Sequence, residues 1–318
     1  MSKVGKYKAA HQKVGDMGNG IDMGGQRRSL SVWIEDKGAV ISRMTGAIVR
    51  ALLVVVLVSI PSVLLPGVTS DSAQVVALIA IFAAALTIFE YASTYPSLVE
   101  FRDAPPFNRV RFVSLFITVF LLTIVLRGTV EPTTLTRFVT AVGNLIGEAI
   151  DFPYSPVRLV VLMLPENTTV EHMLLVRIAA GLSYLISLIT LAVFLILIRI
   201  KGWPTGEKPF NVWVNMPTFD PTVGGDVVDR LIRDARLNII LGFLLPFLIP
   251  ATVKAASSVF VPFTLDSPQT LVWTMSAWAF LPASLFMRGI AMGRIADMIR
   301  EKRRQQSGEF DEDGLQPV

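Results

Sequence analysis

Long unbroken runs of apolar residues dominate the sequence, and polar residues gather in the segments between them. Runs of about 20 apolar residues cross a hydrocarbon layer roughly 30 Å thick. Soluble helices and strands instead alternate apolar and polar positions with a fixed period. The pattern predicts an all-α membrane protein, a bundle of about six transmembrane helices within residues 44–292. The predicted spans cover residues 46–66, 72–93, 110–128, 173–200, 236–262 and 268–292.

Composition agrees with a membrane fold and excludes several kinds of chemistry. Hydrophobic residues make up 52% of the 318 residues and charged residues only 17%, whereas soluble domains carry about a quarter charged residues. The chain has no cysteine, which excludes disulfides, thiolate metal sites and cysteine nucleophiles. Its two histidines, His11 and His172, are too few for paired haem ligands or a three-histidine metal site. Phosphate-binding and hydrolase motifs are also missing, so we expect neither an enzyme nor a cofactor.

Basic residues lie predominantly on one side of the predicted membrane. With the N-terminus in the cytoplasm, all but five of the 29 Lys and Arg residues fall in cytoplasmic segments. Such an asymmetry is expected of cytoplasmic loops, so both termini are predicted to be cytoplasmic. The basic face also predicts contact with anionic lipid headgroups, and its spread without a recognition motif argues against nucleic-acid binding. The five basic residues on the outer side are Arg127, Arg137, Arg158, Arg177 and Lys254.

Segments outside the spans have patterns of their own. Residues 1–43 are predicted to form a cytoplasmic arm with an interfacial helix at 29–44, and residues 293–318 a cytoplasmic tail. On the outer side, residues 135–149 carry a continuous apolar stripe, which predicts an amphipathic helix lying flat in the interface. The run 157–164 is too short to span, and its pattern fits a re-entrant piece, an interfacial strand or a second surface helix.

The loop after the second span, residues 94–111, is rich in aromatic, proline and charged residues. A solvated linker has less aromatic content, so this loop is expected to pack against something. One interpretation is a partner protein. The other is the second aromatic and proline-rich stretch, residues 202–221, with which it would form a cytoplasmic cap. For the first interpretation, the predicted docking residues are Tyr95, Phe101, Arg102, Asp103, Phe107 and Arg109.

Charged residues inside the spans lie near the ends, which argues against a proton-coupled carrier. Glu90 and Arg288, both near inner ends, are predicted to form an interfacial ion pair. Gly143-x-x-x-Gly147 and Gly289-x-x-x-Gly293 have the spacing of close helix contacts.

An acidic and basic cluster precedes the fifth span. Its aspartates alternate with arginines four residues away, which favours ion pairs on one helix over a metal site. The predicted pairs are Asp226–Arg230, Asp229–Arg233 and Arg230–Asp234.

Patterned loops, uncharged spans and missing catalytic motifs predict a non-enzymatic accessory, scaffold or assembly subunit of a membrane complex. It would act with a membrane-protein partner or as a homo-oligomer. The alternative is a channel or transporter for a small neutral or lipid-like solute, with hydroxyl groups such as those of Ser183, Ser187 and Thr190 along its path. The cysteine-free, Val- and Ala-rich spans favour a bacterial cytoplasmic (inner) membrane.

Overall fold

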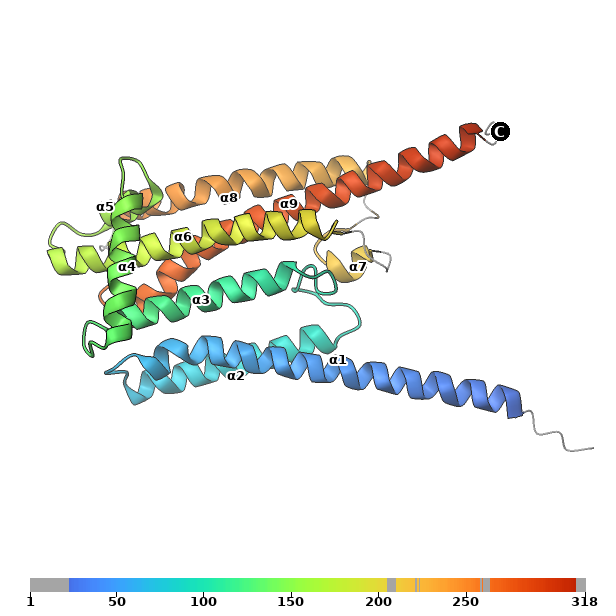
Figure 1. Cartoon of the computed structure of the whole chain (residues 1–318), viewed down its shortest axis with the longest axis horizontal. Helices are drawn as coiled ribbons and strands as arrows, with labels where there is room; N and C mark the ends of the chain where they lie inside the picture. The colour runs from blue at the N-terminus through green and yellow to red at the C-terminus, as the bar shows by residue number, and fades with distance from the viewer. Residues whose placement is uncertain are drawn as a thin grey trace, which may run out of the picture. The chain divides into compact units, whose positions relative to one another are not determined.

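The structure, a computed structural model, describes residues 23–204, 210–220, 222, 224–257, 259 and 264–312, with side chains between residues 42 and 306 of that set. All regular secondary structure in these residues is helical, and six helices are long and apolar enough to cross a membrane (Figure 1). The predicted all-α bundle with six spans is confirmed. Most of the predicted N-terminal arm, residues 1–22, lies outside the described residues.

The helices follow one another in the order α1 (Met23–Leu64), α2 (Ser70–Ala92), α3 (Phe107–Arg127), α4 (Thr134–Ile150), α5 (Pro156–Met163), α6 (Val170–Ile200), α7 (Val212–Asn215), α8 (Val227–Ser257) and α9 (Pro268–Glu312). The six candidate spans lie in α1, α2, α3, α6, α8 and α9. The chain forms two compact units, residues 1–45 and residues 46–318. Helix α1 begins in the first unit and ends in the second.

Three helices are longer than the sequence predicted. The expected interfacial segment 29–44 is helical, but α1 continues through it into the first span without a break, so it is no separate helix. Helix α8 begins nine residues before the predicted span at 236, and α9 continues through the predicted tail to Glu312. Residues 300–305 are all arginine, lysine, glutamate or glutamine, which have high helix propensity. The apolar run therefore ends before this stretch, but the helix continues through it.

Helix α4 is the predicted amphipathic helix, and it runs across the ends of α3 and α6 (Figure 1). It begins with a capping box in which Thr133 and Thr136 exchange hydrogen bonds between side chain and backbone. The apolar side chains of Phe138 and Leu145 are exposed. The opposite face carries Gly147, whose added Cβ would lie 3.0 Å from the carbonyl oxygen of Arg177 in α6. The glycine face therefore packs on the bundle together with Val139 and Ile146, and the rest of the apolar stripe points outward.

Helix α5 occupies the segment that the sequence left open. It is helical rather than extended, and Ser155 begins it by accepting a hydrogen bond from the Arg158 amide at 3.0 Å. Val157 and Val160 are fully buried, and the helix packs against α6 and α8. Burial on this scale makes α5 part of the hydrophobic core and rules out the surface helix and the interfacial strand.

Candidate functional site

Two loops far apart in sequence meet at the end of the bundle where α2 ends and α3 begins. We call the described parts of residues 93–106 and 201–226 the loop cap. The amide of Phe101 donates to the carbonyl of Asn215 at 2.7 Å, and the amide of Asp103 donates to the Asn215 side chain at 3.0 Å. Contact between these two loops was one of the two interpretations of their aromatic content, and it is confirmed.

An aromatic cluster fills the loop cap. The ring of Phe101 lies 4.5 Å from that of Phe107 and 5.7 Å from that of Trp203, between ring centroids. Phe107 in turn contacts Phe194 of α6 at 5.7 Å, edge to face. Phe101 has a φ of 52°, a left-handed conformation that is unfavourable for a bulky residue. Burial of its ring and the hydrogen bond from its amide hold it there. The aromatic residues therefore stabilise the loop cap from within.

An ion pair ties the loop cap to the membrane helices. The guanidinium of Arg288 in α9 donates to both carboxylate oxygens of Glu100, at 2.6 and 2.9 Å. The same guanidinium donates to the side chain of Asn238 in α8 at 3.1 Å. Thr218, from the second loop, donates to Glu100 at 2.6 Å. Residues of four segments thus join one hydrogen-bond network, in which Arg288 and Thr218 bond directly to Glu100. Sequence reasoning missed this network because Glu100 is one of several loop acids with no pattern to single it out.

Glu90 and Arg288 do not pair, so the predicted ion pair between them is wrong. The carboxylate of Glu90, 1% exposed, accepts hydrogen bonds from the backbone amides of Ser97, Leu98 and Val99 and from the Ser97 hydroxyl, at 2.6 to 3.1 Å. A carboxylate with this many donors is satisfied without a cation. Glu90 therefore fixes the turn after α2, and the charge of Arg288 is met by Glu100.

The six predicted docking residues divide into two groups. Phe101 and Phe107 are each 1% exposed, and the side chain of Arg102 donates to the carbonyls of Glu90 and Ser93 at 3.0 and 2.6 Å. These three residues build the loop cap. Tyr95, Asp103 and Arg109 are exposed and accessible to a partner, and Asp103 also pairs with Arg102 at 3.2 Å. Two further large apolar side chains, those of Leu98 and Trp213, are exposed on the same loops.

Two basic side chains lie against aromatic rings where α2 ends and α3 begins. The guanidinium of Arg50 lies 4.5 Å from the centroid of the Tyr91 ring. Arg111, in the first turns of α3, lies 5.3 Å from the ring of Phe107 and 5.6 Å from that of Phe280. Its Nε is buried without a hydrogen-bond partner in the described part of the chain. No local pattern connects these arginines, because they belong to different helices.

Asp226, which precedes α8, and Asp229, in its first turn, pair with α9, so the predicted i,i+4 pairs are wrong. Asp234 lies 3.8 Å from its neighbour Arg233. Asp226 caps α8 by accepting from the Val228 amide at 2.6 Å, and its second oxygen accepts from Arg303 at 2.8 Å. This hydrogen bond from Arg303 lowers the pKa of Asp226. Asp229 lies 3.9 Å from Arg300. The extended α9, which the sequence did not predict, supplies these arginines.

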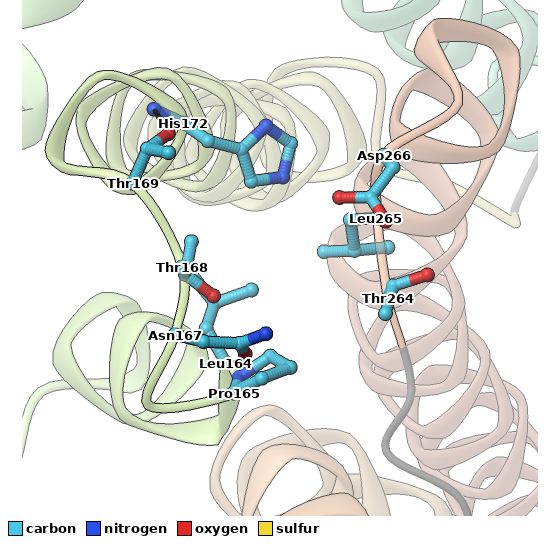
Figure 2. A pocket seen from close by; sticks show the side chains of 9 residues that line it. All are labelled: Leu164, Pro165, Asn167, Thr168, Thr169, His172, Thr264, Leu265 and Asp266. Atoms are coloured by element: carbon cyan, nitrogen blue, oxygen red, sulfur yellow. Dashed lines mark hydrogen bonds between the residues drawn. The ribbon is translucent and has the colours of Figure 1, made fainter.

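At the other end of the bundle, a polar cavity of about 160 Å³ lies between the segment before α6 and the segment before α9 (Figure 2). His172, from the first turn of α6, and Asp266 lie on opposite walls (Figure 2). The Nε2 of His172 is buried without a hydrogen-bond partner among the described residues. At about 30 Å³ per water, this space holds roughly five waters or one small polar molecule. The other polar lining residues are Asn167, Thr168, Thr169 and Thr264.

The fold defines a multi-pass α-helical membrane protein whose loops at one end form an ordered cap. Searches of the sequence against protein-family models and curated proteins, and of the structure against solved structures, find no match.

Proposed function

We propose that this protein is a non-enzymatic subunit of a membrane complex, an accessory, scaffold or assembly factor that docks a partner protein on its loop cap. One observation carries the proposal. The loop cap is held rigid from within, through Glu90, Glu100 and Asn215, while Tyr95 and Trp213 are 69% and 53% exposed. Exposed aromatic residues on a rigid support are typical of interface hot spots, and a plain solvated linker needs no such bracing.

Two of the hydroxyl groups that the solute-path alternative names, those of Ser183 and Thr190, do not support transport. The hydroxyl of Ser183 donates to the carbonyl of Ala179 at 2.7 Å. Thr190 donates to the carbonyl of Ile186, and its hydroxyl also lies 2.7 Å from that of Ser114. Hydroxyl groups bonded to their own helix and buried in the core do not offer hydrogen bonds to a passing solute. The predicted solute path thus gains no support from these residues.

The choice of membrane and the orientation of the protein in it are also part of the proposal. We place the protein in the bacterial cytoplasmic membrane with the loop cap in the cytoplasm. The positive-inside rule supports this orientation, because 24 of the 29 basic residues fall on the loop-cap side of the predicted topology.

The test is native mass spectrometry of the complex purified from its own membranes in a gentle detergent. The double variant Tyr95→Ala/Trp213→Ala is expected to lose a stoichiometric partner that the wild type retains, with an unchanged thermal unfolding midpoint. Phe101, Arg102 and Phe107 are unsuitable for this test, because their replacement disrupts the loop cap itself.

The matched control is Phe152→Ala, which removes an exposed aromatic ring at the other end of the bundle. It is expected to keep the partner. A partner that survives the double variant would place docking elsewhere. A lone chain or homo-oligomer that retains a small molecule would overturn the proposal in favour of transport.

A further inference from the structure

Arg111 is a charged side chain held at the membrane boundary without a counterion at hydrogen-bonding distance. It lies one turn inside α3, between the rings of Phe107 and Phe280. Its Nε is buried, and among the described residues it forms neither a hydrogen bond nor a salt bridge. Buried polar atoms are nearly always hydrogen-bonded, so an orphaned guanidinium nitrogen indicates an acceptor that this chain does not supply.

Arg50 adds a second uncompensated charge at the same place. Its guanidinium stacks on the ring of Tyr91, and it donates only to the carbonyl of Gly46 in its own helix, at 2.8 Å. No salt bridge joins it to any described residue. Tyr91 and Arg111 lie beside the same loop: Tyr91 follows Glu90, whose carbonyl accepts from Arg102, and Arg111 lies against Phe107, whose ring contacts Phe101. This loop brings the charges of Arg50 and Arg111 to one end of the bundle.

The acidic residues nearby are already committed. The Glu90 carboxylate accepts hydrogen bonds from the turn after α2. Arg102 is a third positive charge nearby, and the Asp103 carboxylate, 3.2 Å away, neutralises it. The two oxygens of Glu100 accept from Arg288 and Thr218. Among the described residues, Arg50 and Arg111 therefore keep their positive charges without a carboxylate partner.

An apolar surface lies beside this basic site. A shallow hollow on α2 is lined by Ala85, Ile88, Phe89, Ala92 and Ser93. Ile88 precedes Tyr91 by three residues, and residues three apart are neighbours on a helix surface. The small side chains of Ala85 and Ala92 between larger ones leave room for a chain to lie along the helix. Basic and apolar surfaces thus adjoin at the depth where lipid headgroups meet acyl chains.

We propose that Arg50, Tyr91 and Arg111 bind the phosphate of an anionic phospholipid whose acyl chain lies in the hollow on α2. Guanidinium groups bind phosphate oxygens through paired, charge-assisted hydrogen bonds. The phenol of Tyr91 supplies a further donor. This site does not depend on the docking role of the loop cap, and it narrows the general attraction of a basic face for anionic lipids to three named side chains.

The experiment is a titration of delipidated protein in a neutral detergent, with bound lipid counted by native mass spectrometry. Dioleoyl phosphatidylglycerol is the anionic probe and dioleoyl phosphatidylcholine the zwitterionic one, with inorganic phosphate as a soluble competitor. We expect the anionic lipid to bind at least tenfold more tightly than the zwitterionic lipid. Arg50→Gln and Arg111→Gln should each weaken the anionic lipid about tenfold, since a charge-assisted hydrogen bond contributes that factor.

The control is Arg199→Gln, which removes an exposed charge at the same end of the bundle and should leave binding unchanged. Ala92→Leu fills the hollow and should weaken the lipid while every arginine remains. Thermal unfolding of each variant separates lost binding from lost folding. If Arg111→Gln fails to fold, Arg111→Lys, which retains the charge, is measured in its place. Equal affinity for the two lipids, or full binding by folded arginine variants, would overturn the proposal. If inorganic phosphate displaces the anionic lipid at concentrations similar to those of the lipid, the site binds a soluble anion, and the proposal is equally overturned.

Discussion

The indole nitrogen of Trp278 in α9 donates a hydrogen bond to the backbone carbonyl of Pro246 in α8, at 3.2 Å. This carbonyl has no partner within its own helix, because the residue four positions later is Pro250, which lacks an N–H. In a membrane the freed carbonyl cannot turn to water. The tryptophan of the neighbouring helix therefore supplies the donor that Pro250 removes from α8.

Replacement of Trp278 by phenylalanine should destabilise the bundle. The ring is largely kept, but the buried Pro246 carbonyl loses its only donor, at a cost of about 1–3 kcal/mol. Thermal or denaturant unfolding in detergent measures this cost. Trp273→Phe is the matched control five residues earlier on α9, where the structure gives the indole no such hydrogen bond, and it should have a smaller effect.

A double-mutant cycle tests the proposed cause. Pro250→Ala restores the N–H that α8 lacks, so the Pro246 carbonyl regains a partner in its own helix. In that background Trp278→Phe should cost clearly less than in the wild type. Equal costs in both backgrounds would show that the hydrogen bond is not what Trp278 contributes.

The two glycines of the Gly289-x-x-x-Gly293 motif should respond differently to alanine. At Gly289 an added Cβ would lie 2.7 Å from the carbonyl oxygen of Ala235, where α8 and α9 touch. Separating the helices to fit it should cost about 1–3 kcal/mol. At Gly293 an added Cβ meets nothing within 4 Å. Gly293→Ala should be neutral or stabilising by up to about 1 kcal/mol, because alanine favours the helix.

Unfolding midpoints of the two variants in one detergent make the comparison direct. Similar losses at both positions would mean that the motif acts through backbone freedom and not through close contact at Gly289.

The spans were predictable because their signal is local. Twenty apolar residues in succession have few alternatives to a membrane helix, and the stripe at 135–149 predicts α4 by its period alone. The helix ends were less predictable. Hydrophobicity stops where the bilayer stops, whereas α9 continues on helix propensity and on contacts of Arg300 and Arg303 with the two aspartates at the start of α8. These contacts join residues more than 70 positions apart and leave no mark in the local pattern.

The partners of the candidate site residues were hard to predict. The aromatic content of the two loops left two interpretations open, and the structure shows contact between the loops, but the exposed and buried members of 94–111 look alike in sequence. The pairing of Arg288 was assigned to Glu90, the acid at a similar predicted depth. In the structure Glu90 is used by the amides of the turn after α2, a role set by the backbone path, and Glu100 reaches Arg288 through the fold of the loop.

The Glu100–Arg288 pair should contribute measurably to stability. The side chains are only 14% and 27% exposed, so water screens them weakly. Glu100→Gln leaves the Arg288 charge without its carboxylate and should cost about 2 kcal/mol or more. Arg288→Gln should cost a similar amount, and the double variant should cost less than the sum, because each change removes the same interaction.

A second arginine and glutamate pair provides the comparison. Arg127 and Glu131 lie 2.8 Å apart at the end of α3, but they are 36% and 50% exposed. Glu131→Gln should cost less than about 1 kcal/mol, as is usual for exposed pairs. Equal losses of stability for Glu100→Gln and Glu131→Gln would contradict the proposal that the Glu100–Arg288 pair holds the loop cap on the bundle.

Acid should loosen the start of α8 through Asp226. The hydrogen bond from Arg303 and that from the Val228 amide lower the pKa of this carboxyl in the folded state. A group with a lowered pKa stabilises the fold above its unfolded value, and this contribution is lost as the pH falls through the folded value. Amide exchange at Val228, corrected for intrinsic rates, should therefore rise below about pH 4. Asp226→Asn keeps a good helix cap without a titrating charge, so its exchange should not depend on acid, and identical acid loosening in both proteins would remove Asp226 as the cause.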